Sequence, residues 1–447
     1  MNLLLTLAFA LLLQMQPQSR DGDVPKGYQG TFAITNARIE TVTNGVIENG
    51  TLVIRGDRIE AVGADVAIPS GAEVIDAAGM TVFPGLIDSG TQLGLAEIGA
   101  VHETNDFREV GDLNPELEAL SAVNPNSVLI PVTRVSGVTT VVTEPSGGLF
   151  PGVAALINLV GYTPEQMHAG GVRMMTLQFP AASRRGFFDR RSDEDLKKAA
   201  EKALKKLNDV WDRAVLYARI DSAYHAAPNP DHKPEYVPEM HALMPVVRGE
   251  MPLMIKVQRE KDIRAALDWV KERGLTNVVF SGVAEGWRVA DKIAEAGIPC
   301  LVGPVLSTPT RAYDRYDKAY ANAGLMRQAG VKVALRSGES ENVRNLPFHA
   351  GFAAAYGMGR EEALRAVTIA PAEIFGIADD YGSLEPGKKA NLFIADGDPF
   401  EPETQIRQVF IDGFKIPMTN RQIELYKEFL HRDEGRLTPV KVVPPSN

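Results

Sequence analysis

The pattern of apolar and polar residues differs from one part of the chain to another. The first pattern, near the N-terminus, is a series of short runs in which apolar and polar residues alternate. Between residues 30 and 76, runs such as FAITNARIETV and TLVIRGDRIEAVG alternate apolar and polar positions. Asn44-Gly45 and Gly56-Asp57 lie between these runs, and such pairs are typical of the tight turns that join antiparallel strands. This part of the chain therefore predicts a small antiparallel β module.

The middle of the chain predicts strands that alternate with helices. Apolar runs such as LMIKV (253–257) and NVVFSG (277–282) are each followed by a stretch with helical spacing. Ser192 with Asp195 is similar to a capping box, which predicts the start of a long helix. Residues 221–238, which carry Pro, His and Asn, predict a loop. About eight strand–helix units imply a closed parallel sheet, so residues 81–377 predict a (β/α)8, TIM-like barrel.

Strand patterns return after Pro371, in GSLEPGKKANLFIADGDPF and IRQVFIDGFKI. Their Pro-Gly and Asp-Gly pairs predict turns, and we expect these strands to complete the N-terminal β module. The predicted fold class is thus α/β. It combines a TIM-like barrel with a small β-sandwich module built from both ends of the chain, residues 30–80 and 378–420. Residues 421–447 predict a C-terminal helix and tail.

The first residues predict a targeting segment. Leu3 to Leu13 is an apolar run of the length typical of a signal-peptide core, and it is too short to span a bilayer. Residues 1–19 therefore predict a signal peptide and a secreted or periplasmic protein. No later apolar run reaches the length of a membrane span, so we expect no stable insertion into a membrane.

Composition narrows the possible partners and chemistry. Hydrophobic residues make up 45% and charged residues 23% of the 447 residues, which is typical of a globular chain. The net charge is -10, which argues against nucleic acid as a partner, because proteins that bind nucleic acid usually present a basic surface. The single cysteine, Cys300, can form neither an internal disulfide nor a thiolate metal site.

Four stretches carry a resemblance to a known family: FAITNARIETV with LVIRGDRIEAVG, AAGMTVFPGLID, AVTIAPAEIFGI and GSLEPGKKANLFIADGDP. In the last stretch, Asn391 stands where the family usually has Asp. On these residues the chain resembles the amidohydrolase superfamily, closest to its secreted branch related to imidazolonepropionases. The resemblance implies a catalytic divalent metal, zinc for this family, and hydrolysis of a non-peptide C–N bond in a small cyclic amide-like substrate. Many barrels of this kind form dimers, so a homodimer is one expected assembly, and a heteromer with an intact paralogue is the other.

The metal ligands that the resemblance implies are replaced in this sequence. In TVFPGLIDSGTQLG, the two histidine positions of the first barrel strand hold Gly90 and Gln92. Glycine offers no ligand atom, and a neutral amide oxygen is a weak one. Lys256, near the end of the fifth strand, would repel a cation. We therefore expect no metal ligand set and no cofactor.

Two other routes to a metal site stay open. The usual aspartate of the eighth strand falls at about Gly338, so Glu339 or Glu341 could be a displaced carboxylate. Loop residues such as His102 with Glu103 could also assemble a site. None of the seven histidines forms a His-x-His pair.

The polar residues at the predicted strand ends form the candidate site. A metal-free reaction would use Asp88 or Glu339 as the general base and Lys256 or Arg336 to stabilise an oxyanion. Glu144 closes the second strand and could point into the barrel or into a loop. The residues expected to bind substrate lie at or just beyond strand ends: Gln92, Glu97, Gln258, Glu285, Arg336 and Arg344.

Two functions fit these residues. The first is a hydrolase of non-peptide C–N bonds whose metal-dependent activity is weak or absent, and the family resemblance favours it. The second is a catalytically inactive paralogue that binds a small molecule or pairs with an intact amidohydrolase. The coordinated replacement of the ligands favours the second.

Overall fold

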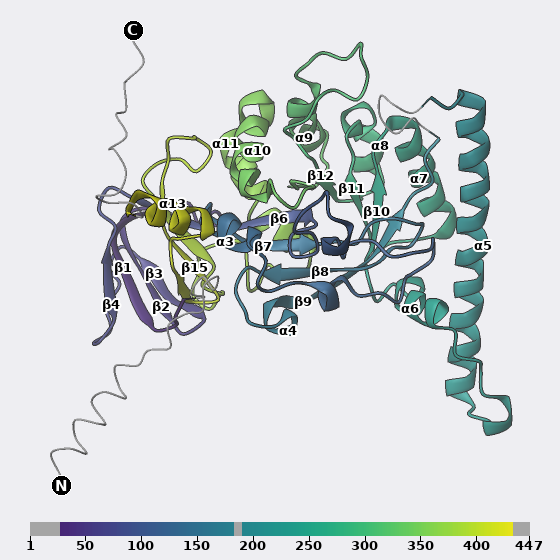
Figure 1. The fold of residues 1–447 in the computed structure, drawn as a ribbon, viewed down its shortest axis with the longest axis horizontal. Helices are drawn as coiled ribbons and strands as arrows, with labels where there is room; N and C mark the ends of the chain where they lie inside the picture. The colour runs from purple at the N-terminus through teal and green to yellow at the C-terminus, as the bar shows by residue number, and fades with distance from the viewer. Residues whose placement is uncertain (1–26, 183–189, 432–447) are drawn as a thin grey trace.

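The computed structural model describes residues 27–182 and 190–431 and contains two large sheets (Figure 1). One sheet forms a barrel, and the other lies beside it and is built from the two ends of the described chain. The predicted signal peptide and the tail after residue 431 lie outside the described residues. Within the two described ranges, no helix is both long enough and apolar enough to cross a membrane.

Eight strands build the barrel sheet. In order they are β13 (Val333–Leu335), β12 (Cys300–Val302), β11 (Val278–Gly282), β10 (Leu253–Val257), β9 (His168–Gln178), β8 (Gly152–Asn158), β7 (Val138–Thr143) and β6 (Leu86–Thr91). The amide N of Gly338 donates to the carbonyl O of Gly90 at 3.0 Å. This bond brings the chain after β13 beside β6 and nearly closes the barrel. The structure therefore confirms the predicted TIM-like barrel.

One barrel strand runs against its neighbours. β8 pairs antiparallel with both β7 and β9, whereas the other pairs in this sheet are parallel. The connections on either side of β8, residues 144–151 and 159–167, are short. Two parallel strands need a crossover of a dozen or more residues, and antiparallel strands do not. The expected uniform strand–helix repeat is therefore wrong at β8.

The helices of the barrel lie outside its strands (Figure 1). The longest, α5 (Asp193–Ala226), begins after Ser192, whose side chain accepts a hydrogen bond from the amide N of Asp195, as the capping pattern predicts. Because α5 continues to Ala226, the predicted loop is wrong for residues 221–226. The other α-helices of this part are α2 (Ala119–Ala122), α3 (Leu129–Arg134), α4 (Pro164–Met167), α6 (Pro238–Val247), α7 (Glu260–Arg273), α8 (Ala290–Glu295), α9 (Lys318–Gln328), α10 (Leu346–Ala353), α11 (Arg360–Ala366) and α12 (Ile369–Ile374).

The second sheet combines strands from both ends of the chain. Its order is β16 (Phe414–Ile416), β15 (Ile406–Ile411), β14 (Leu392–Ala395), β5 (Thr81–Pro84), β1 (Thr31–Glu40), β2 (Val46–Arg55) and β3 (Arg58–Gly63), with β4 (Glu73–Asp76) paired to β1. β2 and β3 form the predicted hairpin. β5 pairs with β1 and β14, so the chain enters the barrel after Gly85 and not at residue 81. A last helix, α13 (Arg421–His431), follows this sheet.

A buried polar cluster joins the two sheets. We call it the seam cluster; its members are Thr140 of β7, Asn158 of β8, and Asn391, which precedes β14. Asn391 Nδ2 donates to Thr140 Oγ1 at 3.1 Å and to Asn158 Oδ1 at 2.9 Å. Asn391 Oδ1 accepts from the amide N of Asp412 at 2.7 Å. Asn391 therefore holds the barrel to the second sheet through both its donor and its acceptor atoms.

Candidate functional site

The carboxyl ends of the barrel strands place a polar layer above an apolar floor. The floor consists of buried apolar side chains, which include Ile87, Val142, Met254, Val279, Leu301 and Ala334. Side chains two residues apart on a strand point to the same face of a sheet. The residues two positions after four of these floor residues are Glu144, Lys256, Ser281 and Arg336. We call these four the central cluster.

Ion pairs hold the central cluster together. Glu144 Oε1 lies 2.8 Å from Lys256 Nζ and 2.5 Å from Arg336 Nη2, and Glu144 Oε2 lies 3.4 Å from Arg336 Nη1. Arg336 Nη1 also donates to Ser281 Oγ. The exposed fraction of the side chain is 2% for Glu144, 7% for Arg336 and 13% for Lys256. Burial alone would raise the pKa of Glu144, but the two cations hold this pKa below its ordinary value.

Asp88 of β6 lies beside the cluster and is fully buried. Its Oδ1 accepts from the amide N atoms of Gly90 at 3.0 Å and of Ser337 at 3.1 Å, and its Oδ2 accepts from the same Ser337 N at 3.3 Å. Burial raises the pKa of Asp88 to about 6, although these hydrogen bonds and the charge of Arg336 oppose the shift. Asp88 therefore links β6 to the chain after β13, and it titrates near neutral pH.

The two positions of the first strand that the family gives to histidine have other roles here. A Cβ atom built on Gly90 would lie 2.8 Å from Arg336 Cζ, so the guanidinium fills the space that a side chain at position 90 would need. Gln92 is half-buried, and its Nε2 donates to Ser146 Oγ at 3.2 Å. The arginine opposite therefore occupies the space beside Gly90.

These residues do not fit a divalent metal. A protein site for such an ion commonly supplies three or more carboxylate, imidazole or thiolate ligands. Residues 27–182 and 190–431 contain no group of three or more His, Cys, Asp or Glu that could hold an ion. Glu144 is already bound by two cations, and Asp88 by backbone amides. The ammonium and guanidinium groups would also repel a divalent cation.

Three other predicted site residues lie at the rim of the barrel. Glu339 and Arg344 are exposed, and Glu339 Oε2 accepts from Asn342 Nδ2 at 2.6 Å. Glu97 is half-buried, and its Oε1 accepts from Asn124 Nδ2 at 3.1 Å. These contacts order the rim loops, and the roles of the three residues in catalysis or binding stay predictions.

Two more predicted residues lie near the end of β11. Gln258 is exposed, and its side chain lies against Gly282, so closely that a Cβ atom there would collide with the amide. Glu285 is fully buried, with its Oε1 2.6 Å from Thr310 Oγ1 and its Oε2 2.6 Å from Arg311 Nη2. Although burial opposes ionisation, these bonds lower the pKa of Glu285 to about 2. Glu285 therefore fastens the loop that follows β12.

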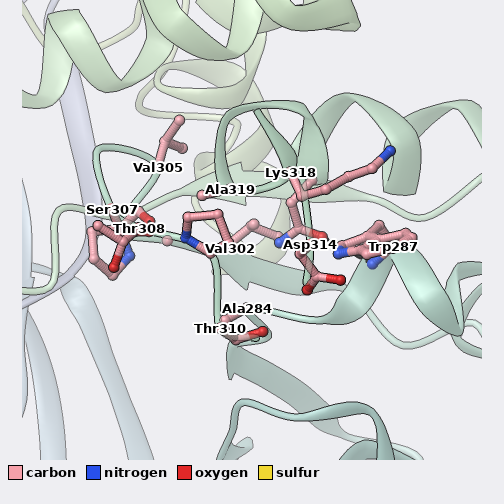
Figure 2. Close-up of a pocket in the computed structure, with 14 residues that line it drawn as sticks. Ala284, Trp287, Val302, Val305, Ser307, Thr308, Thr310, Asp314, Lys318 and Ala319 are labelled. Atoms are coloured by element: carbon pink, nitrogen blue, oxygen red, sulfur yellow. Dashed lines mark hydrogen bonds between the residues drawn. The ribbon is translucent and has the colours of Figure 1, made fainter. Parts of the chain in front are cut away.

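Figure 2 shows a small cavity beside this loop, at the carboxyl ends of β11 and β12. Trp287, Asp314 and Lys318 line it, and its volume is about 20 Å³. The guanidinium of Arg288 stacks over the Trp287 ring, 4.1 Å from its centroid. A cavity of this size has room for about one water molecule, so it cannot hold a cyclic amide.

The sequence identifies Lys256, Arg336 and Glu144 separately, and the structure places the three side chains in one cluster. Lys256 is expected to stabilise an oxyanion and Arg336 to bind substrate, and both lie in the central cluster. The direction of Glu144 is left open by the sequence, and in the structure it points into the barrel and pairs with both cations. The two-residue spacing from the floor residues Val142 and Met254 could have shown that Glu144 and Lys256 face the barrel interior, but it does not show that they pair.

Sequence relatives extend along most of the chain. An amidohydrolase family model matches residues 306–418. The imidazolonepropionase of Porphyromonas gingivalis is 28% identical over 384 residues, which cover 78% of this chain and 82% of that protein. The imidazolonepropionase of Shouchella clausii is 26% identical over 400 residues, which cover 80% of this chain and 81% of that protein.

Fold similarity agrees with these matches. A crystal structure of an amidohydrolase from Thermotoga maritima superposes with a TM-score of 0.76 at 24% identity, and the match covers 87% of this chain and 100% of that one. The family match, the sequence relatives, the nearly closed barrel and the second sheet together support the amidohydrolase superfamily for this chain. In sequence the chain is similar to the imidazolonepropionases.

Proposed function

We propose that this chain acts on a non-peptide C–N bond of a small cyclic amide-like molecule, and that its metal-dependent activity is weak or absent. The substrate class comes from the relatives, which are named as imidazolonepropionases and align with most of the chain. The observation that carries the proposal is the set of ion pairs from Glu144 to Lys256 and Arg336 at the barrel centre. That cluster offers positive charge without a metal.

The proposed chemistry uses the groups at the strand ends. Lys256 and Arg336 would stabilise the oxyanion that forms when water adds to an amide carbonyl. Asp88 would act as the general base, because a pKa of about 6 leaves it ionised at pH 7 but still able to accept a proton. Glu339 is a second candidate base, and it lies exposed at the rim.

Binding of the substrate would involve neutral side chains at the mouth of the barrel. Gln92 and Gln258 lie at the ends of β6 and β10, and their amide groups can donate to and accept from a cyclic amide. Arg344 and Glu97 would contribute from the surrounding loops.

A second candidate function is a catalytically inactive paralogue that binds a small molecule or pairs with an intact amidohydrolase. One observation favours it: both carboxylates at the barrel centre are already engaged, Glu144 by cations and Asp88 by backbone amides. Neither therefore has a ready position for an attacking water.

Hydrolysis of imidazolone-type cyclic amides by the purified chain tests the proposal. Ring opening is followed by absorbance, with protein treated with chelator and with protein supplied with zinc or manganese. We expect turnover that changes by less than about twofold when metal is added, and a loss of about 100-fold in Asp88→Asn, the size typical of a lost general base. The exposed Asp65→Asn is the control, and its rate should match that of the unchanged protein.

Two outcomes would overturn the proposal. A large rise in rate on adding metal would mean that a metal site forms after all. No turnover by any preparation, together with saturable binding of the same cyclic amides, would establish the inactive paralogue instead.

A further inference from the structure

The space around Arg336 explains why the central cluster can form. A Cβ atom on Gly90 would lie 2.8 Å from Arg336 Cζ and 3.0 Å from Arg336 Nε. A Cβ atom on Gly303, which follows β12, would lie closest to the backbone O of Arg336 and 3.0 Å from its Cγ. Gly303 therefore mainly lets the backbone of Arg336 come close, whereas Gly90 leaves the room that the guanidinium occupies. By the family resemblance, Gly90 is one of the positions of a histidine ligand.

The contacts of Arg336 cross the barrel instead of following the sheet. β6 and the chain after β13 are neighbours, but Glu144 follows β7 and Lys256 belongs to β10. Arg336 meets Glu144 at 2.5 Å, and Glu144 meets Lys256 at 2.8 Å. The three side chains therefore connect strands that share no backbone hydrogen bonds, as a metal ion with ligands from several strands does.

We propose that the Arg336 guanidinium, paired with Glu144, which also binds Lys256, is an internal crosslink of the open end of the barrel that replaces the metal of the family. Gly90 is the residue that makes room for it. The crosslink and a metal site with a histidine at position 90 exclude each other. A histidine at position 90 would collide with Arg336, and a divalent ion would be repelled by Arg336 and Lys256. This role concerns the stability of the barrel, so it holds whether or not the chain hydrolyses an amide.

Thermal unfolding of four forms of the full chain tests the proposal: unchanged, Gly90→Ala, Arg336→Ala, and the double variant. Arg336→Ala leaves the pair of Lys256 with Glu144 intact and removes the atoms nearest Gly90. We expect Gly90→Ala to lower the Tm by about 1–3 °C in the unchanged background, because it overpacks the barrel. In the Arg336→Ala background the same change should shift the Tm by less than about 0.5 °C.

Gly99→Ala is the matched control. Gly99 has an ordinary φ, and the nearest atom to a Cβ there is Glu341 Oε1 at 3.7 Å, so this change should leave the Tm unaltered in both backgrounds. A Gly90→Ala penalty that is the same in both backgrounds would overturn the proposed fit between Gly90 and Arg336. If Arg336→Ala yields no folded protein, Arg336→Lys takes its place in the cycle, since lysine lacks the Cζ and Nη atoms.

The metal-free nature of the crosslink has its own test on the unchanged protein. We expect the same Tm, within about 1 °C, with excess chelator and with zinc or manganese, because only an ion that binds the folded state shifts the unfolding equilibrium. A Tm that falls with chelator would mean that an ion stabilises the barrel and would overturn the proposal.

Discussion

The seam cluster and the central cluster are both buried and polar, but they are built from different chemistry. The seam cluster uses neutral groups, the side chains of Thr140, Asn158 and Asn391. The central cluster uses full charges, with one carboxylate between two cations. Neutral hydrogen bonds and one bond from Asn158 Nδ2 to the Asp412 carboxylate join the two sheets, whereas ion pairs hold the open end of the barrel.

Each cluster contains one residue that differs from the pattern that the family resemblance implies. In each cluster the neighbouring side chains make contacts that suit the residue present here. Asn391 stands where the family usually has Asp, and its Nδ2 makes two donor bonds that an aspartate could not make. Gly90 stands where the family has a histidine, and Arg336 fills the space that is left. The comparison teaches that these substitutions belong to local rearrangements of contacts.

The largest expected effect comes from removing the shared carboxylate. Glu144→Gln would leave Lys256 and Arg336 as buried cations without their counter-ion, and breaking such a buried pair costs about 3–5 kcal/mol. Unfolding by urea measures the change in the free energy of unfolding. The exposed Glu339→Gln is the control; a cost for Glu144→Gln no larger than that of the control would show that the charged cluster does not stabilise the barrel.

Asp88, beside the central cluster, should make stability depend on pH between about pH 4 and pH 7. The folded-state pKa of Asp88 is raised from 3.8 to about 6, so the folded state holds this proton more tightly than the unfolded state. Its contribution to stability is complete below about pH 4 and is lost as the pH rises through 6, with a total of about 3 kcal/mol.

Asp88→Asn isolates that contribution. The free energy of unfolding is measured from pH 4 to pH 7 for both proteins, and the stability of the variant relative to the unchanged chain should rise across this interval. A difference between the two proteins that stays constant with pH would contradict the raised pKa of Asp88.

A smaller effect is expected at the seam. Asn391→Asp would restore the residue that the family usually has, but it would lose the donor bonds to Thr140 and Asn158 and bring a charge into a buried site. Leaving such partners unsatisfied costs about 1–3 kcal/mol. Asn126→Asp, on the surface, is the control. Equal urea midpoints for the two variants would mean that the seam does not distinguish Asn from Asp.

The sequence predicts most of the fold because the fold depends on patterns that are local. Alternating runs and turn pairs predict the strands of the second sheet, and the capping pattern at Ser192 predicts the start of α5. The direction of β8 is different, since an apolar run is the same whichever way its strand points. The pairing of β5 with β1 and β14 likewise depends on contacts between distant segments.

The sequence predicts which residues belong to the candidate site better than it predicts which of them form ion pairs with one another. By the family resemblance, the sequence places Gly90 and Gln92 at the two histidine positions, and it identifies Lys256 and Arg336 as strand-end residues. That Glu144 binds both cations depends on which side chains face inward and on the closure of the barrel, which joins residues 192 positions apart. Spacing along one strand cannot supply that information.

The most direct test of the central claim is elemental analysis of the purified full chain, expressed with zinc, manganese and iron available. A barrel whose open end is held by Arg336, Glu144 and Lys256 should retain less than about one tenth of an equivalent of any of these metals after dialysis, because its donor set does not fit them. About one equivalent of tightly held metal, in a folded protein, would contradict the claim and would show that ligands assemble around the cluster.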